Sequence, residues 1–260
     1  MKLAFSTLGC PEWTLEQAID KAVEYGFQGI EIRGIRNELN AEKIEELNAA
    51  NRESTLLNAK NNGIEFCCLG ASASFHEKEK QQVNMQEALA TVRQASACKI
   101  PYIRIFGNSL TQEDINAQMK DIASRIRILC QEAQMQQVTV LLEVHGDFNT
   151  SERILRTADF VACDNFGIIW DIKHSREDPH LFWKHTKHLI RHIHLKDSIN
   201  DDLCNFGEGT IGVENIVRMT ANDGYEGFYS LEWEKRWHPQ LRDASEEFPH
   251  YVHIMNTILC

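Results

Sequence analysis

The segment TLEQAIDKAVEYGFQGIEIRG, residues 14–34, carries the pattern that decides the fold. The apolar residues of its first part recur at helical spacing, at Leu15, Ala18, Ile19, Ala22 and Val23. Thr14 followed by Gln17 fits a capping box, and Gly26 fits a helix stop. The closing GIEIRG is a short apolar run between polar segments. The segment therefore predicts a helix over 14–26 and a strand near 29–34.

The same alternation of strand and helix continues along the whole chain. Further apolar runs are LAFST (3–7), IEFCCLG (64–70), YIRIFG (102–107), TVLLEVH (139–145), FGIIWDIKH (166–174), LIRHIHLKD (189–197) and GFYSLEWE (227–234). Polar segments with helical periodicity, such as DIASRIRILCQEAQ, separate them. Eight such units predict parallel strands joined by crossovers in one (β/α)8 TIM barrel over residues 1–260. A doubly wound sheet is the alternative, but it usually has fewer strands, and no G-x-G-x-x-G follows the first run.

Composition limits the partners of the chain. Its 260 residues are 43% hydrophobic and 25% charged, as in globular proteins, and its formal net charge is −11. Such a charge repels phosphate backbones, so we expect no nucleic-acid partner. No apolar run reaches membrane-spanning length, which predicts no membrane partner. The closing stretch EFPHYVHIMNTILC predicts an amphipathic helix on its own barrel or on a neighbouring copy, so homo-oligomerisation stays open.

The eight cysteines show no C-x-x-C spacing, and several lie in apolar patterns. We expect reduced, mostly buried thiols in a cytoplasmic protein.

The last polar residues of the final strands suggest a site. In IRHIHLKD (190–197), His192, His194 and Lys196 share one face of a strand because side chains alternate. The active sites of such barrels lie at the carboxyl ends of the strands. The polar residues predicted at those ends are Glu143, His145, Asp171, His174, His194, Lys196, Glu232 and Glu234.

Converging carboxylates in a strand core lose hydration and repel one another unless a cation compensates them. Glu143, Asp171 and Glu232 would supply oxygens and His194 a nitrogen to one divalent ion, which can be Mn²⁺, Mg²⁺, Co²⁺ or Zn²⁺. His194 is preferred over His192 because it lies nearer the end of its strand.

The chain resembles the xylose isomerase-like TIM barrels, the group of sugar phosphate isomerases and epimerases and family 2 AP endonucleases. The resemblance rests on LLEVHGDF, IIWDIKH, HIHLKD, FGEGTIG and YEGFYSLEWE, in this order. It implies a metal held by the four residues just named. By analogy with the ketose 3-epimerases, Glu143 and Glu232 would also move the substrate proton, and His174 would contact substrate oxygens.

The resulting hypothesis is a metal-dependent isomerase or epimerase of a small polyol, ketose or sugar phosphate, acting through a metal-stabilised enediolate. Lys196 and His145 are candidate proton donors, which completes the catalytic set. Arg104 is a candidate for binding a substrate anion, and pairing with a neighbouring glutamate is its alternative role. Glu208 and Trp233 are further candidates for substrate binding, with turn formation and core packing as their alternatives.

Two other classes stay open. A lyase of the 3-dehydroshikimate or inosose dehydratase type is suggested by the E-x-H pair Glu143–His145, but the first branch commonly has glutamine where this chain has His194. A non-catalytic metal-binding protein would keep the ligands alone. DNA cleavage is disfavoured because GIEIRG and FCCLGAS lack the extra histidines of those relatives, and His76 is expected in a surface loop or lid. The sequence does not identify the substrate, the metal or the oligomeric state.

Overall fold

The computed structural model describes residues 2–111 and 114–259. Its barrel strands are β1 (Lys2–Ser6), β2 (Gly29–Ile32), β3 (Glu65–Ser74), β4 (Tyr102–Phe106), β5 (Thr139–Glu143), β6 (Phe166–Asp171), β7 (Ile190–Leu195) and β10 (Phe228–Leu231). Within the described residues these eight strands form a closed barrel in the order β1-β10-β7-β6-β5-β4-β3-β2. The predicted (β/α)8 barrel is confirmed. Each observed strand lies within the apolar run that predicted it or extends beyond that run by a few residues.

Contacts within the chain define two compact halves. The terminal half contains the chain up to Leu39, Lys43–Cys67 and the chain from His192 onward. The central half contains Asn40–Glu42 and Cys68–Arg191. Each half is described by itself below.

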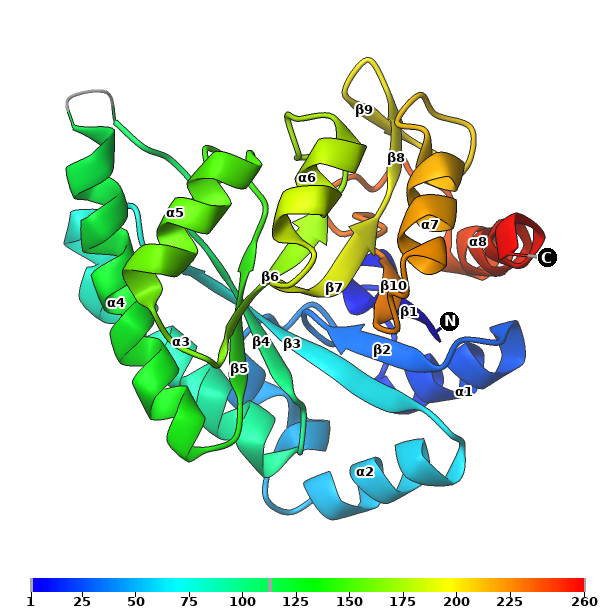
Figure 1. Ribbon diagram of the computed structural model, residues 1–260. Helices are drawn as coiled ribbons and strands as arrows, with labels where there is room; N and C mark the ends of the chain where they lie inside the picture. Colours follow the sequence, from blue (N-terminus) through cyan, green and yellow to red (C-terminus); the bar gives the residue numbers. More distant parts are fainter. Residues whose placement is uncertain (1, 112–113, 260) are drawn as a thin grey trace. The chain divides into compact units, whose positions relative to one another are not determined.

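In the terminal half, β2, β1, β10 and β7 pair in parallel in that order. Its helices are α1 (Leu15–Tyr25), α2 (Arg52–Asn61), α7 (Val213–Asn222) and α8 (Ala244–Leu259). The predicted capping box of α1 is present, because Gln17 N donates to Thr14 Oγ1 at 3.1 Å and Thr14 N donates to Gln17 Oε1 at 2.9 Å. Gly26 ends this helix with φ 90°. The closing helix α8 packs against α1 and α7 (Figure 1).

A small hairpin follows β7 and was not predicted. It pairs β8 (Asp197–Ile199) with β9 (Asp202–Cys204) in antiparallel fashion. Its two turn residues, Asn200 and Asp201, have φ of 52° and 70°. Positive φ at both positions is typical of the type I′ turn, whose twist matches that of the strands.

The central half has β3, β4, β5 and β6 as parallel neighbours. Its helices are α3 (Gln81–Ala97), α4 (Ile115–Met135), α5 (Ser151–Val161) and α6 (Pro179–Thr186), and α3 to α6 pack in succession (Figure 1). Cys68, Leu141 and Ile169 form a buried cluster, with Tyr102 packed against it. Short 3-10 helices in the described chain are η1 (Thr7–Gly9), η2 (Ala41–Lys43), η3 (Glu45–Leu47) and η4 (Lys78–Lys80).

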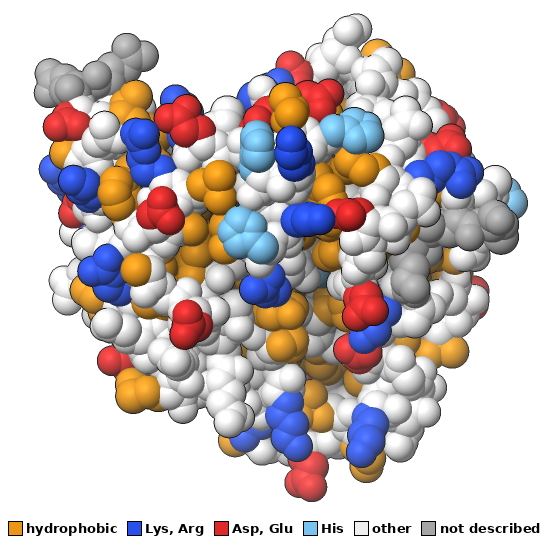
Figure 2. All heavy atoms as spheres, in the orientation of Figure 1, with side chains coloured by type: hydrophobic (Ala, Val, Ile, Leu, Met, Phe, Trp, Pro, Cys, Tyr) orange, Lys and Arg blue, Asp and Glu red, His pale blue; other side chains and the backbone are white. Residues whose placement is uncertain are grey.

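One face of the surface is mixed in charge, and most of the described cysteines are buried. On the face seen in Figure 2, basic and acidic side chains are intermingled. The described cysteines are thiols, of which Cys10, Cys67, Cys68, Cys98 and Cys130 are buried and Cys163 and Cys204 are partly exposed. Cys260 lies outside the described residues. Among the described helices, none combines the length and the apolar character needed to cross a bilayer.

Candidate metal and active site

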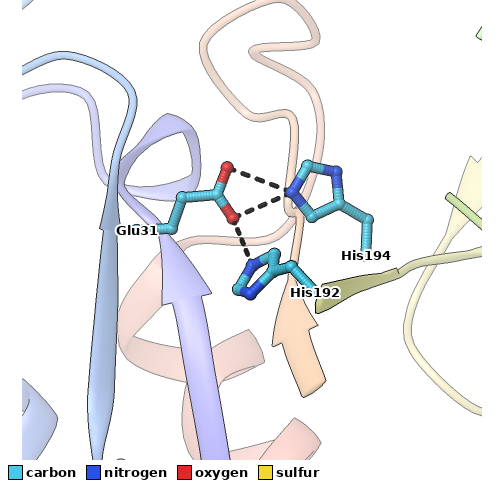
Figure 3. Close-up of side chains that lie close together, drawn as sticks. All are labelled: Glu31, His192 and His194. Carbon is cyan, nitrogen blue, oxygen red and sulfur yellow. Dashed lines mark hydrogen bonds and ion pairs between the residues drawn. The ribbon is translucent and has the colours of Figure 1, made fainter. Parts of the chain in front are cut away.

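Two histidines of β7 and a glutamate of β2 meet inside the terminal half (Figure 3). His192 Nε2 lies 2.9 Å from Oε2 of Glu31. His194 Nε2 lies 2.8 Å from Oε2 and 3.0 Å from Oε1 of the same carboxylate. All three side chains are buried. Two of the three polar side chains on this face of IRHIHLKD, His192 and His194, are therefore directed at a carboxylate that sequence analysis did not select.

Small side chains allow Glu31 to reach across the strands between β2 and β7. Ser6 on β1 is level with Glu31, and Ser230 on β10 is level with His194. Side chains two residues apart on a strand share a face, so Ala4, level with Ser230, lies on the same side as Ser6. Ser230 Oγ also donates to Glu31 Oε2 at 3.1 Å. Short residues on the two middle strands thus leave room for the longer side chains to meet.

The protonation of this cluster follows from its burial and its charges. Burial alone would raise the pKa of Glu31, but His194 and His192 outweigh it and hold that pKa well below its usual value. Burial lowers the pKa of His192, so this imidazole is neutral near pH 7. Burial would lower the pKa of His194 as well, but Glu232 and Glu31 raise it well above its usual value. Without a metal, His194 is therefore a cation between two carboxylates.

Glu232, directly after β10, is the second carboxylate beside His194. Its Oε2 lies 3.3 Å from His194 Nδ1 and accepts a hydrogen bond from Lys196 Nζ at 2.5 Å. Lys196 Nζ also donates to Glu234 Oε1 at 2.6 Å. The ammonium is 1% exposed, so two carboxylates compensate its charge in the interior. The structure thus brings together three of the predicted site residues, His194, Lys196 and Glu232.

In the central half, Glu143 at the end of β5 is paired with Arg104 of β4. Arg104 Nη1 donates to Glu143 Oε2 at 2.7 Å, and both side chains are buried. Arg104 also stacks on Phe106, with its guanidinium carbon 4.2 Å from the ring centre. The alternative considered for Arg104, pairing with a neighbouring glutamate, is present in the structure.

Asp171, the last residue of β6, organises the turn that follows. Its Oδ1 accepts hydrogen bonds from the main-chain N–H groups of Lys173 at 3.0 Å and His174 at 3.3 Å. Its Oδ2 lies 2.7 Å from Nδ1 of His174. The His174 ring is 4.3 Å from the ring of His145, measured between centres. The two predicted histidines of the central half therefore stand edge to face.

A chain of hydrogen bonds continues from His145 to His76. His145 Nδ1 lies 3.0 Å from Asn108 Oδ1, and Asn108 Nδ2 donates to Ser74 Oγ at 3.0 Å. Ser74 Oγ lies 2.7 Å from His76 Nδ1. His76, expected only as a surface or lid residue, is partly buried and belongs to this network.

The loops after β4 and β5 are joined beside His145. Asp147 N donates to Asn108 O at 2.8 Å, and Leu110 N donates to Asp147 Oδ2 at 2.7 Å. Gly146 has φ 59°, and a Cβ there would lie 2.7 Å from Asn108 O. Glycine is needed at this position both for its backbone conformation and for the close contact.

Asp197, next to Lys196, holds the loop that contains FGEGTIG and was also not predicted. Its Oδ1 accepts from Ser198 N at 2.9 Å and from Ile211 N at 3.4 Å. Its Oδ2 accepts from Gly207 N at 3.2 Å and from Gly209 N at 2.9 Å. One buried carboxylate thereby fixes the conformation of the loop between β9 and α7.

The two remaining substrate-binding candidates have other contacts. Trp233 is 1% exposed, and its Nε1 donates to Arg242 O at 2.9 Å, which is the packing alternative. Glu208 is exposed and accepts from Asn205 Nδ2 at 2.9 Å across its own turn. Neither contact involves the predicted ligands.

The residues predicted to bind a metal have the chemistry of a divalent site. Glu143, Asp171, His194 and Glu232 are buried candidate ligands, two from each half. Three carboxylates and an imidazole suit a divalent cation of intermediate hardness. In the terminal half the pair is already arranged, because His194 Nδ1 is directed at Glu232. Further groups of candidate ligands are Glu31–His192–His194 and Glu143–His145–His174.

The fold and these side chains define a (β/α)8 barrel with buried acid–imidazole clusters at the ends of its strands. The family model described as "Xylose isomerase-like TIM barrel" matches residues 19–251, so the chain belongs to this family. No curated protein matches the chain by sequence.

Solved structures of low sequence identity share the fold over the full length. The probable 3-DHS dehydratase AsbF of Bacillus anthracis has a TM-score of 0.85 and 19% identity, covering 98% of this chain and 99% of its own. The 3-keto-D-glucoside 4-epimerase YcjR of E. coli, in its apo form, has a TM-score of 0.78 and 18% identity, covering 100% of both chains. The IolI protein with a bound zinc atom has a TM-score of 0.77 and 16% identity, covering 98% and 97%.

Proposed function

We propose that this protein is a divalent-metal-dependent isomerase or epimerase of a small polyol or ketose. The observation that carries the proposal is the environment of Glu232, whose Oε2 contacts both His194 Nδ1 and Lys196 Nζ. A carboxylate held between a metal-binding imidazole and a proton donor is suited to proton transfer at carbon beside the cation.

Each proposed catalytic group follows from its contacts. Glu232 and Glu143 are the two bases that remove and return the carbon-bound proton. Lys196 is the donor to a substrate oxygen, and Glu234 keeps its charge compensated when Glu232 turns toward the substrate. Arg104 positions Glu143 from the adjacent strand.

The metal ligands in this proposal are Glu143, Asp171, His194 and Glu232. Carboxyl ends of barrel strands face one rim, which is why groups from both halves are assigned to one cation. A divalent cation, when bound there, polarises the carbonyl oxygen of a ketose and so acidifies the adjacent C–H group. The similarity to solved structures named as epimerases, and to one with bound zinc, supports this assignment.

A dehydratase is the second candidate, and the geometry of His145 favours it. Asn108 Nδ2 donates to Ser74, so its Oδ1 is the acceptor and His145 Nδ1 carries the hydrogen of their contact. The imidazole next to His174 is therefore held in one orientation, as a general acid for a leaving hydroxyl requires. The structure named as a probable 3-DHS dehydratase has the same fold.

Exchange in D₂O separates these reactions. Protein reconstituted with Mn²⁺, Co²⁺, Mg²⁺ or Zn²⁺ is incubated with a panel of ketoses, keto-glycosides and 3-dehydroshikimate, with metal-stripped protein as the control. Deuterium at carbon without loss of water supports the isomerase or epimerase. Loss of water with rising ultraviolet absorbance from a conjugated product supports the dehydratase instead. No metal-dependent exchange or elimination on any compound would refute both and leave a metal-binding protein without catalysis.

A further inference from the structure

The buried carboxylate of Glu31 is not used by the proposed reaction, yet three donors converge on it. They are His192 Nε2 at 2.9 Å, His194 Nε2 at 2.8 Å and Ser230 Oγ at 3.1 Å, all to Oε2. His194 Nε2 is also 3.0 Å from Oε1, so one imidazole nitrogen spans both oxygens. Glu31 itself is 1% exposed. An isolated carboxylate would not be stable there, and these donors account for its burial.

The direction of these hydrogen bonds fixes which imidazole nitrogens carry protons. An ionised carboxylate can only accept, so the hydrogen in each contact lies on the histidine Nε2. A neutral histidine with hydrogen on Nε2 has its lone pair on Nδ1. For His194, Nδ1 is the atom that lies 3.3 Å from Glu232 Oε2. The two ends of one ring therefore face two different carboxylates, as Figure 3 shows for the Glu31 side.

We propose that Glu31 is a positioning residue that holds His194 through Nε2–H and thereby makes Nδ1 the atom that binds the metal. This inference rests on the proposed function, because it takes His194 and Glu232 as ligands. A carboxylate that accepts a hydrogen bond from a ligating histidine orients the ring and increases the basicity of the ligating nitrogen. Glu31 makes this contact from β2, across β1 and β10.

His192 serves the same carboxylate rather than the cation. Its Nε2 faces Glu31, and within the described residues its Nδ1 has no hydrogen-bond partner and is buried. The ring pair His192–His194 stands edge to face, with centres 5.4 Å apart. His192 therefore restrains Glu31 through its Nε2, and Glu31 in turn restrains His194.

Glu31 could instead bind the cation directly, since Glu31, His192 and His194 are close enough to share one. In that arrangement both histidines would ligate through Nε2, and His194 Nδ1 would stay directed at Glu232. The ligating nitrogen of His194 thus distinguishes the two arrangements. Nδ1 is assigned as the ligating atom because it faces Glu232, a ligand of the proposed site.

The test uses ¹⁵N-histidine-labelled full-length protein and Zn²⁺ as the probe. Long-range ¹H–¹⁵N spectra of the zinc form should show His194 with a metal-shifted Nδ1 and a protonated, low-field Nε2–H. In Glu31→Ala the low-field Nε2–H signal should be lost, and in Glu31→Gln, whose amide oxygen is a weaker and uncharged acceptor, it should move to higher field. In both variants, Zn²⁺ affinity by competition titration should fall, by about 10–100-fold in Glu31→Ala. Ser230→Ala, which removes the one of these three donors to Glu31 that is not an imidazole, is the matched control and should stay close to wild type.

The outcomes separate the two levels of the argument. Unchanged affinity and unchanged ¹⁵N shifts in folded Glu31→Ala would overturn the inference while leaving the metal site in place. Zinc on His194 Nε2 would overturn it in favour of Glu31 as a ligand. Wild-type protein that binds no Zn²⁺ through His194 would instead overturn the proposed function. Glu31→Gln retains the side-chain shape, and circular dichroism of both variants excludes unfolding as the cause of a loss.

Discussion

Replacing Asp197 with asparagine should destabilise the protein measurably, although the change removes only one charge. The carboxylate is 2% exposed and accepts four main-chain hydrogen bonds, two on each oxygen. An asparagine at this position keeps one oxygen and turns an NH₂ group toward two N–H donors. Those two bonds cannot form, and their N–H donors lose their acceptor.

The magnitude follows from the lengths of the bonds. If the amide group replaces Oδ1, the bonds lost are those from Ser198 N at 2.9 Å and Ile211 N at 3.4 Å, of which only the first is short. Hydrogen bonds to a charged acceptor contribute about 1.5–3 kcal/mol each. We therefore expect a loss of about 3 kcal/mol in the free energy of unfolding, which is a fall of about 6–12 °C in Tm for a chain of this size.

Urea and thermal unfolding followed by circular dichroism measure this loss. Asp202→Asn is the matched control, because Asp202 lies in the same hairpin and is exposed. It removes the same charge and should leave Tm nearly unchanged. If Asp197→Asn melted together with this control, the view that one carboxylate holds the loop would be wrong.

The remaining predictions concern the charged groups of the two halves. Glu232→Gln should lower turnover by about 10²–10⁴-fold with an unchanged circular dichroism spectrum, since it removes a base but leaves Glu234 to pair with Lys196; near-normal turnover in a steady-state assay would exclude Glu232 as the base. Arg104→Ala leaves a buried carboxylate on Glu143 and should cost about 3–5 kcal/mol in urea unfolding, and a loss within experimental error would count against their pairing. In EDTA, which keeps the site free of metal, folding lowers the pKa of Glu31 from 4.5. The ionised Glu31 therefore stabilises the folded protein above about pH 4.5, and this stability is lost as pH falls through the folded-state pKa. Folding raises the pKa of His194 from 6.5. The protonated His194 therefore stabilises the folded protein below about pH 6.5, and this stability is lost as pH rises through the folded-state pKa. The urea midpoint of unfolding should therefore decrease toward both acid and alkaline pH, and Glu31→Gln should remove much of the decrease toward acid pH. A urea midpoint that does not change with pH in the wild-type protein would contradict both pKa shifts.

The barrel could be predicted from sequence because its signals are local. Each strand is an apolar run of a few residues, and each helix repeats its apolar residues with its own period. The start of α1 was also predictable, since Thr14 and Gln17 lie in one turn and cap each other. The hairpin β8–β9 was not predicted because its strands have only three residues each and show no marked alternation of apolar and polar residues. Its Asn200–Asp201 turn was the one available signal.

The site was predictable only in part, because its partners are far apart along the chain. Residues at the ends of strands, such as Glu232 and His194, follow from the rule that barrel sites lie there. Glu31 contacts His194 across 163 positions of sequence, and in GIEIRG it is indistinguishable from a surface glutamate. Asp197 was equally hidden, because most of its hydrogen-bond donors come from a loop whose path depends on the finished fold. Which side chains meet across strands depends on the register between strands that are distant in sequence. A short stretch of one sequence does not show that register.

The junction between Gly146 and Asn108 has a consequence for altering specificity. The loops after β4 and β5 are joined by two hydrogen bonds, Asp147 N to Asn108 O and Leu110 N to Asp147 Oδ2. They also approach so closely at Gly146 that a side chain there would collide with Asn108. A graft that exchanges one of these loops alone would leave the other without its hydrogen-bond partners and would displace the His145 imidazole. Directed evolution of this barrel should therefore treat the two loops as one exchangeable cassette, inherited or replaced as a pair.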